Sequence, residues 1–169
     1  MSKKAIGGNA ERELLKILQS DGWLVVRSAG SKGTADIYAV KKFHDDISNE
    51  DKFMPLLIEV KSTSKQAWSA KYRDREKEQF EDYVEMYKRY GIPILYFIRH
   101  RDRTDKDKWY VIIPDYDNEP KYPFFRVGRN MTLKFFLEKL NMAQGDMGAW
   151  KAWESEYKMM MRLKGGDKE

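Results

Sequence analysis

The six residues Leu56–Lys61, LLIEVK, carry the pattern that decides the fold, and the rest of the chain can be placed around them. A β-strand turns successive side chains to opposite faces, so Leu57, Glu59 and Lys61 would share one face of this strand. A carboxylate and an ammonium group in so apolar a run are costly unless they are paired or bind a ligand. Glu59 and Lys61 are therefore candidate functional residues, although such a pair is more common on a solvated strand face.

A further carboxylate, Asp36, lies at the start of the preceding apolar run, Ala35–Val40. If the first strands form a meander, Asp36 and Glu59 would meet at one end of the sheet. Two carboxylates suit a divalent cation, which prefers hard oxygen ligands, and a lysine two residues after the second can hold a phosphate or orient a water molecule. This combination predicts metal-assisted hydrolysis of a phosphodiester.

The composition fits one basic domain with one adequate core. The chain has 169 residues, of which 41% are hydrophobic and 35% charged, and its formal net charge is +5. A positive charge combined with 10 Tyr, 8 Phe and 5 Trp is typical of nucleic-acid binders. A basic domain unrelated to nucleic acid has the same composition, so charge alone does not decide.

The residues that the chain lacks exclude several kinds of site. It has no cysteine, which excludes disulfides, thiolate zinc sites and cysteine nucleophiles, and it has only two histidines. No apolar run approaches the ~20 residues that cross a bilayer, and no apolar segment follows the basic N-terminus as in a secretory signal. We expect no membrane association and a cytoplasmic protein, or a viral protein that works in the host cytoplasm.

The first predicted helix runs from Ala10 to Ser20, with Asn9 as its N-cap after a short basic tail. At about 100° per residue, Glu11 falls within the apolar stripe of this helix and Arg12 points to the opposite side. A glutamate in the first turn also favours the helix dipole, so Glu11 suits either that role or a role facing the sheet.

The order of elements predicts an α/β fold, with a mixed five-stranded β-sheet flanked by helices and at least one crossover. The polar segment Lys41–Phe53 is expected to be a long hairpin connection, and Ser62–Ala70 a loop. We expect a single domain over residues 1–169, with a core over about 7–127 and a C-terminal helical extension over about 128–169. The predicted strands are Trp23–Arg27, Ala35–Val40, Met54–Lys61, Ile92–Ile98, Trp109–Ile113 and a short edge strand at Phe124–Val127, and the later helices are Arg73–Tyr90, Leu133–Leu140 and Ala149–Leu163.

Four parts of the chain together resemble the archaeal-type Holliday junction resolvases, which belong to the PD-(D/E)XK, or restriction-endonuclease-like, nucleases. They are GNAEREL at Gly8–Leu14, VRSAGSK at Val26–Lys32, Asp36, and IEVK at Ile58–Lys61. The match extends from about Gly7 to Ile113, and VRSAGSK is much more specific than the Asp…Glu-x-Lys pattern that many nucleases share. Ala35 replaces the family's proline, as is usual in this branch, and the pattern also fits a viral or phage member.

The resemblance implies a restriction-endonuclease-like core and a Mg²⁺-dependent endonuclease, for which Mn²⁺ substitutes. It implies a homodimer that makes paired nicks in a four-way junction during DNA recombination and repair. The residues that match the family's catalytic set are Glu11, Asp36, Glu59 and Lys61. The implied metal ligands are Asp36, Glu59, Glu11 and the backbone carbonyl of Val60.

DNA contacts are expected from basic and small polar residues near this site. The resemblance implies that the VRSAGSK loop contacts the strand to be cut. Basic residues after the third strand and early in the second long helix would touch the phosphate backbone, with little sequence information but strong salt dependence. The expected DNA-binding residues are Arg12, Arg27, Ser28, Ser31, Lys32, Lys65 and Arg73.

Three other functions stay open at this point. The first is a related PD-(D/E)XK nuclease that acts on flaps, nicks or duplex DNA. The second is a nuclease-like protein that only binds DNA, and the intact set of Glu11, Asp36, Glu59 and Lys61 argues against it. The third is a basic domain unrelated to DNA, which salt-dependent binding of a junction would exclude.

Overall fold

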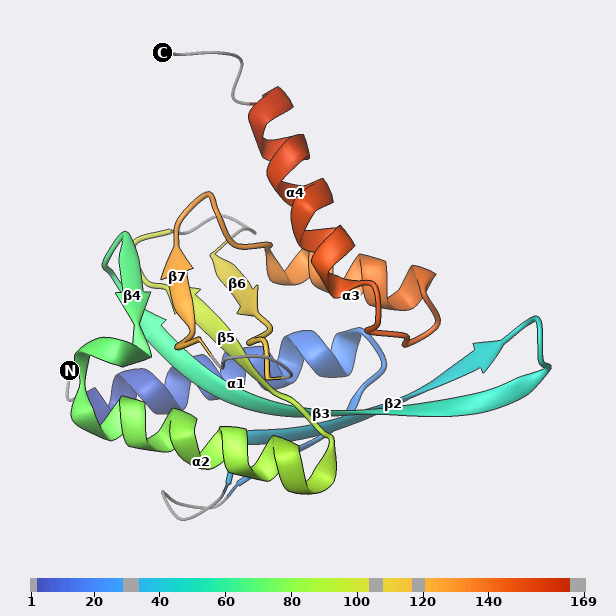
Figure 1. The fold of residues 1–169 in the computed structure, drawn as a ribbon, viewed down its shortest axis with the longest axis horizontal. Coiled ribbons are helices and arrows are strands. Elements are labelled where there is room, and N and C mark those ends of the chain that lie inside the picture. Colours follow the sequence, from blue (N-terminus) through green and yellow to red (C-terminus); the bar gives the residue numbers. More distant parts are fainter. Residues whose placement is uncertain (1–2, 29–33, 104–107, 117–120, 165–169) are drawn as a thin grey trace.

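A computed structural model of the chain describes residues 3–28, 34–103, 108–116 and 121–164. The elements in chain order are α1 (Lys3–Ser20), β1 (Leu24–Arg27), β2 (Ile37–Asp45), β3 (Glu50–Thr63), β4 (Ala67–Ser69), a short 3₁₀ turn (Ala70–Tyr72), α2 (Asp74–Tyr90), β5 (Ile94–His100), β6 (Trp109–Ile112), β7 (Phe124–Arg126), α3 (Leu133–Met142) and α4 (Trp150–Lys164). Five strands form one sheet in the order β1-β2-β3-β5-β6, in which only β3 and β5 are parallel (Figure 1). The predicted mixed five-stranded sheet is thus confirmed, and α2 makes the crossover between β3 and β5.

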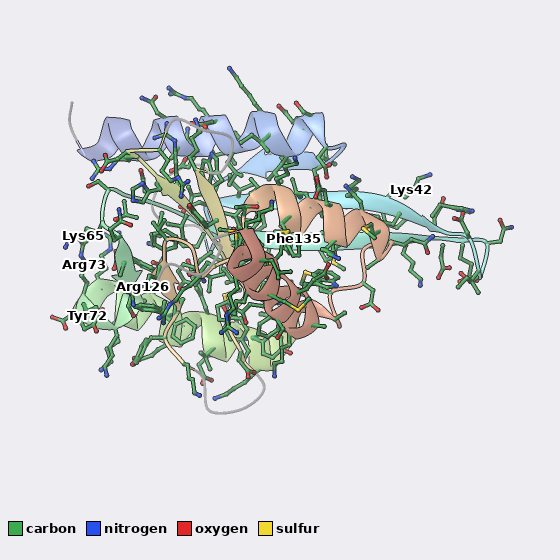
Figure 2. All side chains as sticks on the ribbon, turned by 90° about the horizontal axis from the view of Figure 1, so that it is seen from above. Lys42, Lys65, Tyr72, Arg73, Arg126 and Phe135 are labelled. Carbon is green, nitrogen blue, oxygen red and sulfur yellow. The ribbon has the colours of Figure 1, made fainter. Side chains whose placement is uncertain are left out.

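The sheet carries a hydrophobic core on each face. Along β3, Leu56 and Ile58 join the core beneath α1 and α3, whereas Leu57 packs beside α2 with Glu59 on the same face. Figure 2 shows α1 and α2 on opposite sides of the sheet. The period-2 assignment of Leu57 and Glu59 to one face is therefore confirmed, and that face is the one that α2 covers.

The first helix begins earlier than predicted. α1 starts at Lys3, so Asn9 lies inside the helix and is not its N-cap, and Gly7–Gly8 does not interrupt it. A glycine in a helix interior costs roughly 1 kcal/mol relative to alanine. The complete burial of Leu14 and Leu18 against the sheet offsets this cost, because most helical stability in proteins comes from packing of the apolar face.

The segment Lys41–Phe53 continues β2 and β3, so the prediction of a long hairpin connection there is wrong. Strand pairing leaves only residues 46–49 as the turn. Opposite charges across the two strands stabilise this hairpin arm, as in the 3.1 Å ion pair between Lys42 and Asp51. The hairpin arm (residues 41–53) extends beyond the other elements in Figure 1, and Lys42 marks it in Figure 2.

The predicted loop Ser62–Ala70 contains β4, so that prediction is also wrong. β4 pairs antiparallel with β7 in a separate two-stranded ribbon, in which Ala67 lies opposite Arg126. Trp68 turns inward, and its ring centroid lies 5.8 Å from that of Tyr96. The ribbon depends on two segments far apart in the sequence, which is why local patterns do not predict it.

The last two helices belong to the core on the α1 face. Phe136 of α3 is fully buried, and its ring centroid lies 5.9 Å from that of Phe97 in β5. Trp153 and Tyr157 of α4 are buried in the same hydrophobic cluster. We propose on this basis that residues 1–169 form one domain, for which a single unfolding transition by fluorescence and circular dichroism is the expected result. None of the helices in the described part of the chain combines the length and apolar character needed to cross a membrane.

Candidate active site

The pairing of β2 with β3 places Asp36 opposite Glu59. Ile37 pairs with Ile58 at the end of the ladder, and the amide of Asp36 donates to the carbonyl of Ile58 at 3.0 Å. One step further in this antiparallel register, Asp36 and Glu59 are cross-strand neighbours on one face. Asp36 Oδ2 accepts a hydrogen bond of 2.8 Å from the amide of Val60, which directs the carboxylate along the edge of β3.

The charged form of Asp36 is disfavoured at this position. Burial is the largest cause and the carboxylate of Glu59 is the next, and together they raise the pKa of Asp36 from 3.8 to about 6. The hydrogen bond from Val60 opposes this rise. The fold therefore holds two carboxylates together at a point where a bound cation would relieve their repulsion.

Glu59 belongs to a closed ring of hydrogen bonds that joins β3 to α2. Its Oε1 accepts from Lys61 Nζ at 2.6 Å, and its Oε2 accepts from the hydroxyl of Tyr83 at 2.6 Å. Gln79 completes the ring, because its Oε1 accepts from Lys61 Nζ at 3.2 Å and its Nε2 donates to the hydroxyl of Tyr83 at 2.7 Å. Only 4% of Glu59 is exposed, so the ring satisfies a carboxylate that would be costly to bury alone.

Sequence reasoning alone misses Gln79 and Tyr83. Tyr83 fits the apolar stripe of α2, and it does lie in the core beside Phe80. The available signal is the spacing: residues four apart share one face of a helix, so a glutamine four residues before a buried tyrosine also faces inward. Burial and the charge of Glu59 raise the pKa of Tyr83 far above its usual value, so its hydroxyl stays protonated and can donate.

Glu11 lies at the edge of this group. It forms an ion pair with Arg27 at the end of β1, and its charge adds to the causes that raise the pKa of Asp36. Arg12, the next residue of α1, is exposed. Over the described ranges of the chain, no three Asp, Glu or His side chains converge as a group ready to hold a metal ion. The structure thus brings Asp36, Glu59 and Lys61 together and turns Glu11 toward Arg27.

The chemistry of the residues present fits a hard divalent cation. Asp36 and Glu59 offer carboxylate oxygens, which such ions prefer, and their mutual repulsion disfavours the metal-free charged pair. The amide of Val60 points toward Asp36, and in an extended strand the carbonyl of the same residue points to the same side. A third oxygen donor is therefore directed at the side of β3 on which Asp36 lies.

Basic side chains and one tyrosine lie in and beside the segment between β3 and α2. Lys65 follows the end of β3, and Arg73 immediately precedes α2; both are exposed. In Figure 2 they gather with Tyr72 and Arg126 at one end of the molecule. Their arrangement suits contact with a phosphate backbone, although Arg73 also lies 3.4 Å from Glu76 in an ion pair.

The loop after β1 starts beside Asp36. The amide of Ser28 donates to the carbonyl of Asp36 at 2.9 Å, which ties the start of this loop to the candidate site. Arg27, the preceding residue, is exposed as well as paired with Glu11. Ser31 and Lys32, which are also expected to contact DNA, lie outside the residues that the structure describes.

Comparison with known proteins gives a family and a related structure. A family model described as archaeal Holliday junction resolvase (Hjc) matches residues 2–142. The structure is similar to that of Hjc, a Holliday junction resolvase from the archaeal hyperthermophile Archaeoglobus fulgidus, with a TM-score of 0.49 and 18% identity, over 78% of this chain and 95% of that chain. A search of curated proteins gives no match. Because the family model matches most of its length, this chain belongs to the archaeal Holliday junction resolvase (Hjc) family.

Proposed function

We propose that this protein cuts four-way DNA junctions by metal-dependent hydrolysis of phosphodiester bonds, and that Asp36, Glu59 and Lys61 form its reacting centre. The observation that carries the proposal is the pairing of two carboxylates across β2 and β3, one of them with a pKa raised to about 6, beside an ammonium group. Membership of the Hjc family supports a nuclease, and it supports branched DNA as the substrate.

A divalent cation, Mg²⁺ with Mn²⁺ as a substitute, would be held by Asp36, Glu59 and the carbonyl of Val60. Glu11 would contribute directly or through water, which would require it to turn from Arg27. When bound, the cation supplies Lewis-acid polarisation of the scissile phosphate and lowers the pKa of a water molecule.

Lys61 and α2 have distinct roles in this proposal. The ammonium of Lys61 orients the attacking water or stabilises charge that develops on the phosphoryl oxygens. Gln79 and Tyr83 act as positioning residues: Gln79 holds Lys61 by a hydrogen bond of 3.2 Å, Tyr83 holds Glu59 by one of 2.6 Å, and neither is assigned a contact with the attacking water or the phosphate. The ring fixes both groups before DNA arrives, which reduces reorganisation during the reaction.

A homodimer would place two such sites on one junction. Exposed apolar side chains lie on β1, β2 and β3. The register of these strands places them on the same face of the sheet as Glu59. We propose that a second copy of the chain covers this face, because a four-way junction has near-twofold symmetry and an isologous interface has the same symmetry. The exposed residues are Leu24 (73%), Val26 (58%), Tyr38 (36%), Val40 (38%) and Phe53 (66%).

The DNA interface would surround the reacting centre. We assign to it the basic and small polar residues of α1, of the loop after β1 and of the segment between β3 and α2. Salt would weaken their binding strongly, because contacts with phosphates release counterions. These residues are Arg12, Arg27, Ser28, Ser31, Lys32, Lys65 and Arg73.

Cleavage of a labelled synthetic junction, and of a flap, a nicked duplex and a linear duplex built from the same strands, tests the substrate class. With Mg²⁺ we expect symmetrical cuts in the junction, no comparable cutting of the other substrates, and complete loss of cutting in EDTA. Equal cutting of junction and duplex would indicate a general nuclease, and tight junction binding without any cutting would indicate a protein that only binds DNA.

A further inference from the structure

A groove of about 710 Å³ lies between the turn that follows β7 and helix α4. Figure 1 shows α4 rising beside this turn at the top of the view. The groove is open to solvent and lies apart from the pair of Asp36 and Glu59, whose residues do not line it. The side chains that matter for its chemistry are Phe124, Arg129, Glu154, Lys158 and Arg162.

The lining of this groove is predominantly positive. It contains three cations and one carboxylate, and the carboxylate of Glu154 lies 3.7 Å from the ammonium of Lys158. Arg129 and Arg162 form no ion pair or side-chain hydrogen bond with any residue in the described ranges. Two guanidinium groups, from segments far apart in the sequence, thus face one concavity with their donors available. Such groups suit phosphate, which arginine binds through two parallel hydrogen bonds.

The turn that carries Arg129 is braced by hydrogen bonds from the side chain of Asn130. Asn130 is 8% exposed; its Oδ1 accepts from the amide of Arg126 at 2.8 Å, and its Nδ2 donates to the carbonyl of Phe124 at 3.3 Å. Gly128 supplies a φ of +77°, which other residues rarely adopt. A guanidinium presented from such a turn loses little backbone freedom on binding a ligand.

Basic residues lie in the segments between the candidate active site and this groove. Lys65 lies just beyond the end of β3, Arg126 lies opposite Ala67 of the adjoining β4, and Arg129 follows three residues after Arg126. Figure 2 shows Lys65, Arg73 and Arg126 at the same end of the molecule. Basic residues spread over several segments favour a long polyanion over a short acidic peptide, because duplex DNA presents one phosphate charge per ~1.7 Å along its axis.

We propose that the groove between the β7 turn and α4 binds the phosphate backbone of a DNA arm that leaves the branch point, with Arg129 and Arg162 as the contacts. This inference rests on the proposed function and extends its DNA interface to the C-terminal helix. The family model ends at residue 142, whereas α4 begins at Trp150. Arg129 thus lies within the residues that the family model matches, and Arg162 lies outside them.

The test compares binding of a synthetic four-way junction by the wild type and the double variant Arg129→Ala/Arg162→Ala over a range of KCl concentrations, in Ca²⁺ to prevent cutting. The expected loss of affinity at about 0.1 M KCl is on the order of tenfold, and the slope of log K against log salt should fall by about 2. The rate of cutting in Mg²⁺ at saturating protein should stay within about twofold, because neither arginine touches the reacting centre.

Two further variants separate this contact from a general effect of charge or folding. Lys134→Ala/Lys151→Ala removes two exposed positive charges from α3 and α4, outside the groove, and should bind as the wild type does. Arg129→Lys/Arg162→Lys keeps both charges and should keep the salt slope. Equal affinity and slope for the alanine variant and the wild type would overturn this inference alone. A wild type that neither binds nor cuts the junction would overturn the proposed function and this inference with it.

Discussion

At the scale of single residues, Asp36 is held where its charge lowers the stability of the metal-free protein. Its pKa is about 6 in the folded chain against 3.8 ordinarily, so the native state binds more protons than the unfolded state between these values. Stability is then lost as pH rises toward 6 and stays low above it. Asp36→Asn should therefore stabilise the protein by about 2 kcal/mol at pH 8 in EDTA, and by less as the pH falls toward 4.5.

Urea unfolding in EDTA at several pH values measures this effect. Saturating Mg²⁺ should raise the stability of the wild type but not that of Asp36→Asn, because an ion that binds only the native site stabilises it by linkage. Two results would show that the surroundings of Asp36 do not destabilise its carboxylate. Asp36→Asn would be less stable than the wild type at pH 8, or the difference in free energy of unfolding between the two proteins would be the same at every pH.

The hydroxyl of Tyr83 tests the role of α2 in positioning the site. Tyr83→Phe removes the 2.6 Å hydrogen bond to Glu59 and should slow cutting of the junction by on the order of tenfold with little change in binding. The matched control is Tyr116→Phe, which removes a buried 2.8 Å hydrogen bond to the carbonyl of Ile94, away from the site. Both should cost about 1 kcal/mol of stability, so an equal loss of cutting in the two variants would mean that Tyr83 acts through stability alone.

Local sequence patterns predict some residues of the candidate site, whereas the role of others depends on tertiary packing. The alternation of side chains in a strand is a local property, so the shared face of Glu59 and Lys61 could be predicted. The register that sets Asp36 against Glu59 follows once the two runs are taken as neighbours. Gln79 and Tyr83 could not be assigned, because their role arises only when α2 packs on that face of β3.

At the scale of elements, the hairpin arm is fixed to the rest of the molecule through the connection between α3 and α4. The ring of Phe43 lies so close to Gly145 that an added Cβ would meet its Cδ2 at 2.6 Å, and Gly145 also has a φ of +85°. Gly145→Ala should cost about 2–4 kcal/mol, from overpacking and backbone strain together. Thermal or urea unfolding measures the cost.

Gly91, at the end of α2, provides the matched control. Its φ is +69° and an added Cβ would meet nothing within 4 Å, so Gly91→Ala isolates the backbone cost of about 1 kcal/mol. Similar losses for the two alanine variants would mean that Phe43 does not press on Gly145 and that the arm is not fixed there.

The elements that were mispredicted share one physical cause. The hairpin arm is rich in charge, which is typical of a connection, but its charges pair across the two strands and support the ladder. β4 exists because β7 pairs with it, and α1 reaches back to Lys3 because its later turns are anchored by burial. In each case a tertiary partner overrode a local preference.

At the scale of the whole molecule, the exposed apolar face of β1, β2 and β3 should hold two copies together. Leu24→Ser/Val26→Ser should shift the protein from dimer to monomer, as measured by light scattering after size-exclusion chromatography. Junctions should then be nicked on one strand instead of two. Met159→Ser/Leu163→Ser is the matched control on α4, where both residues are also exposed (61% and 77%). A monomeric wild type, or an unchanged dimer in the β1 variant, would contradict the proposed interface.

In the proposed function, Asp36 belongs to a metal-dependent centre that cuts four-way junctions. The most direct measurement is the single-turnover rate of junction cutting in Mg²⁺, with binding measured in parallel, for the wild type, Asp36→Asn and the control Asp82→Asn, whose carboxylate is exposed on α2. We predict that Asp36→Asn binds the junction at least as tightly as the wild type but cuts it at least about a hundredfold more slowly, whereas Asp82→Asn is unaffected. Cutting by Asp36→Asn at the wild-type rate would show that Asp36 is not part of the reacting centre.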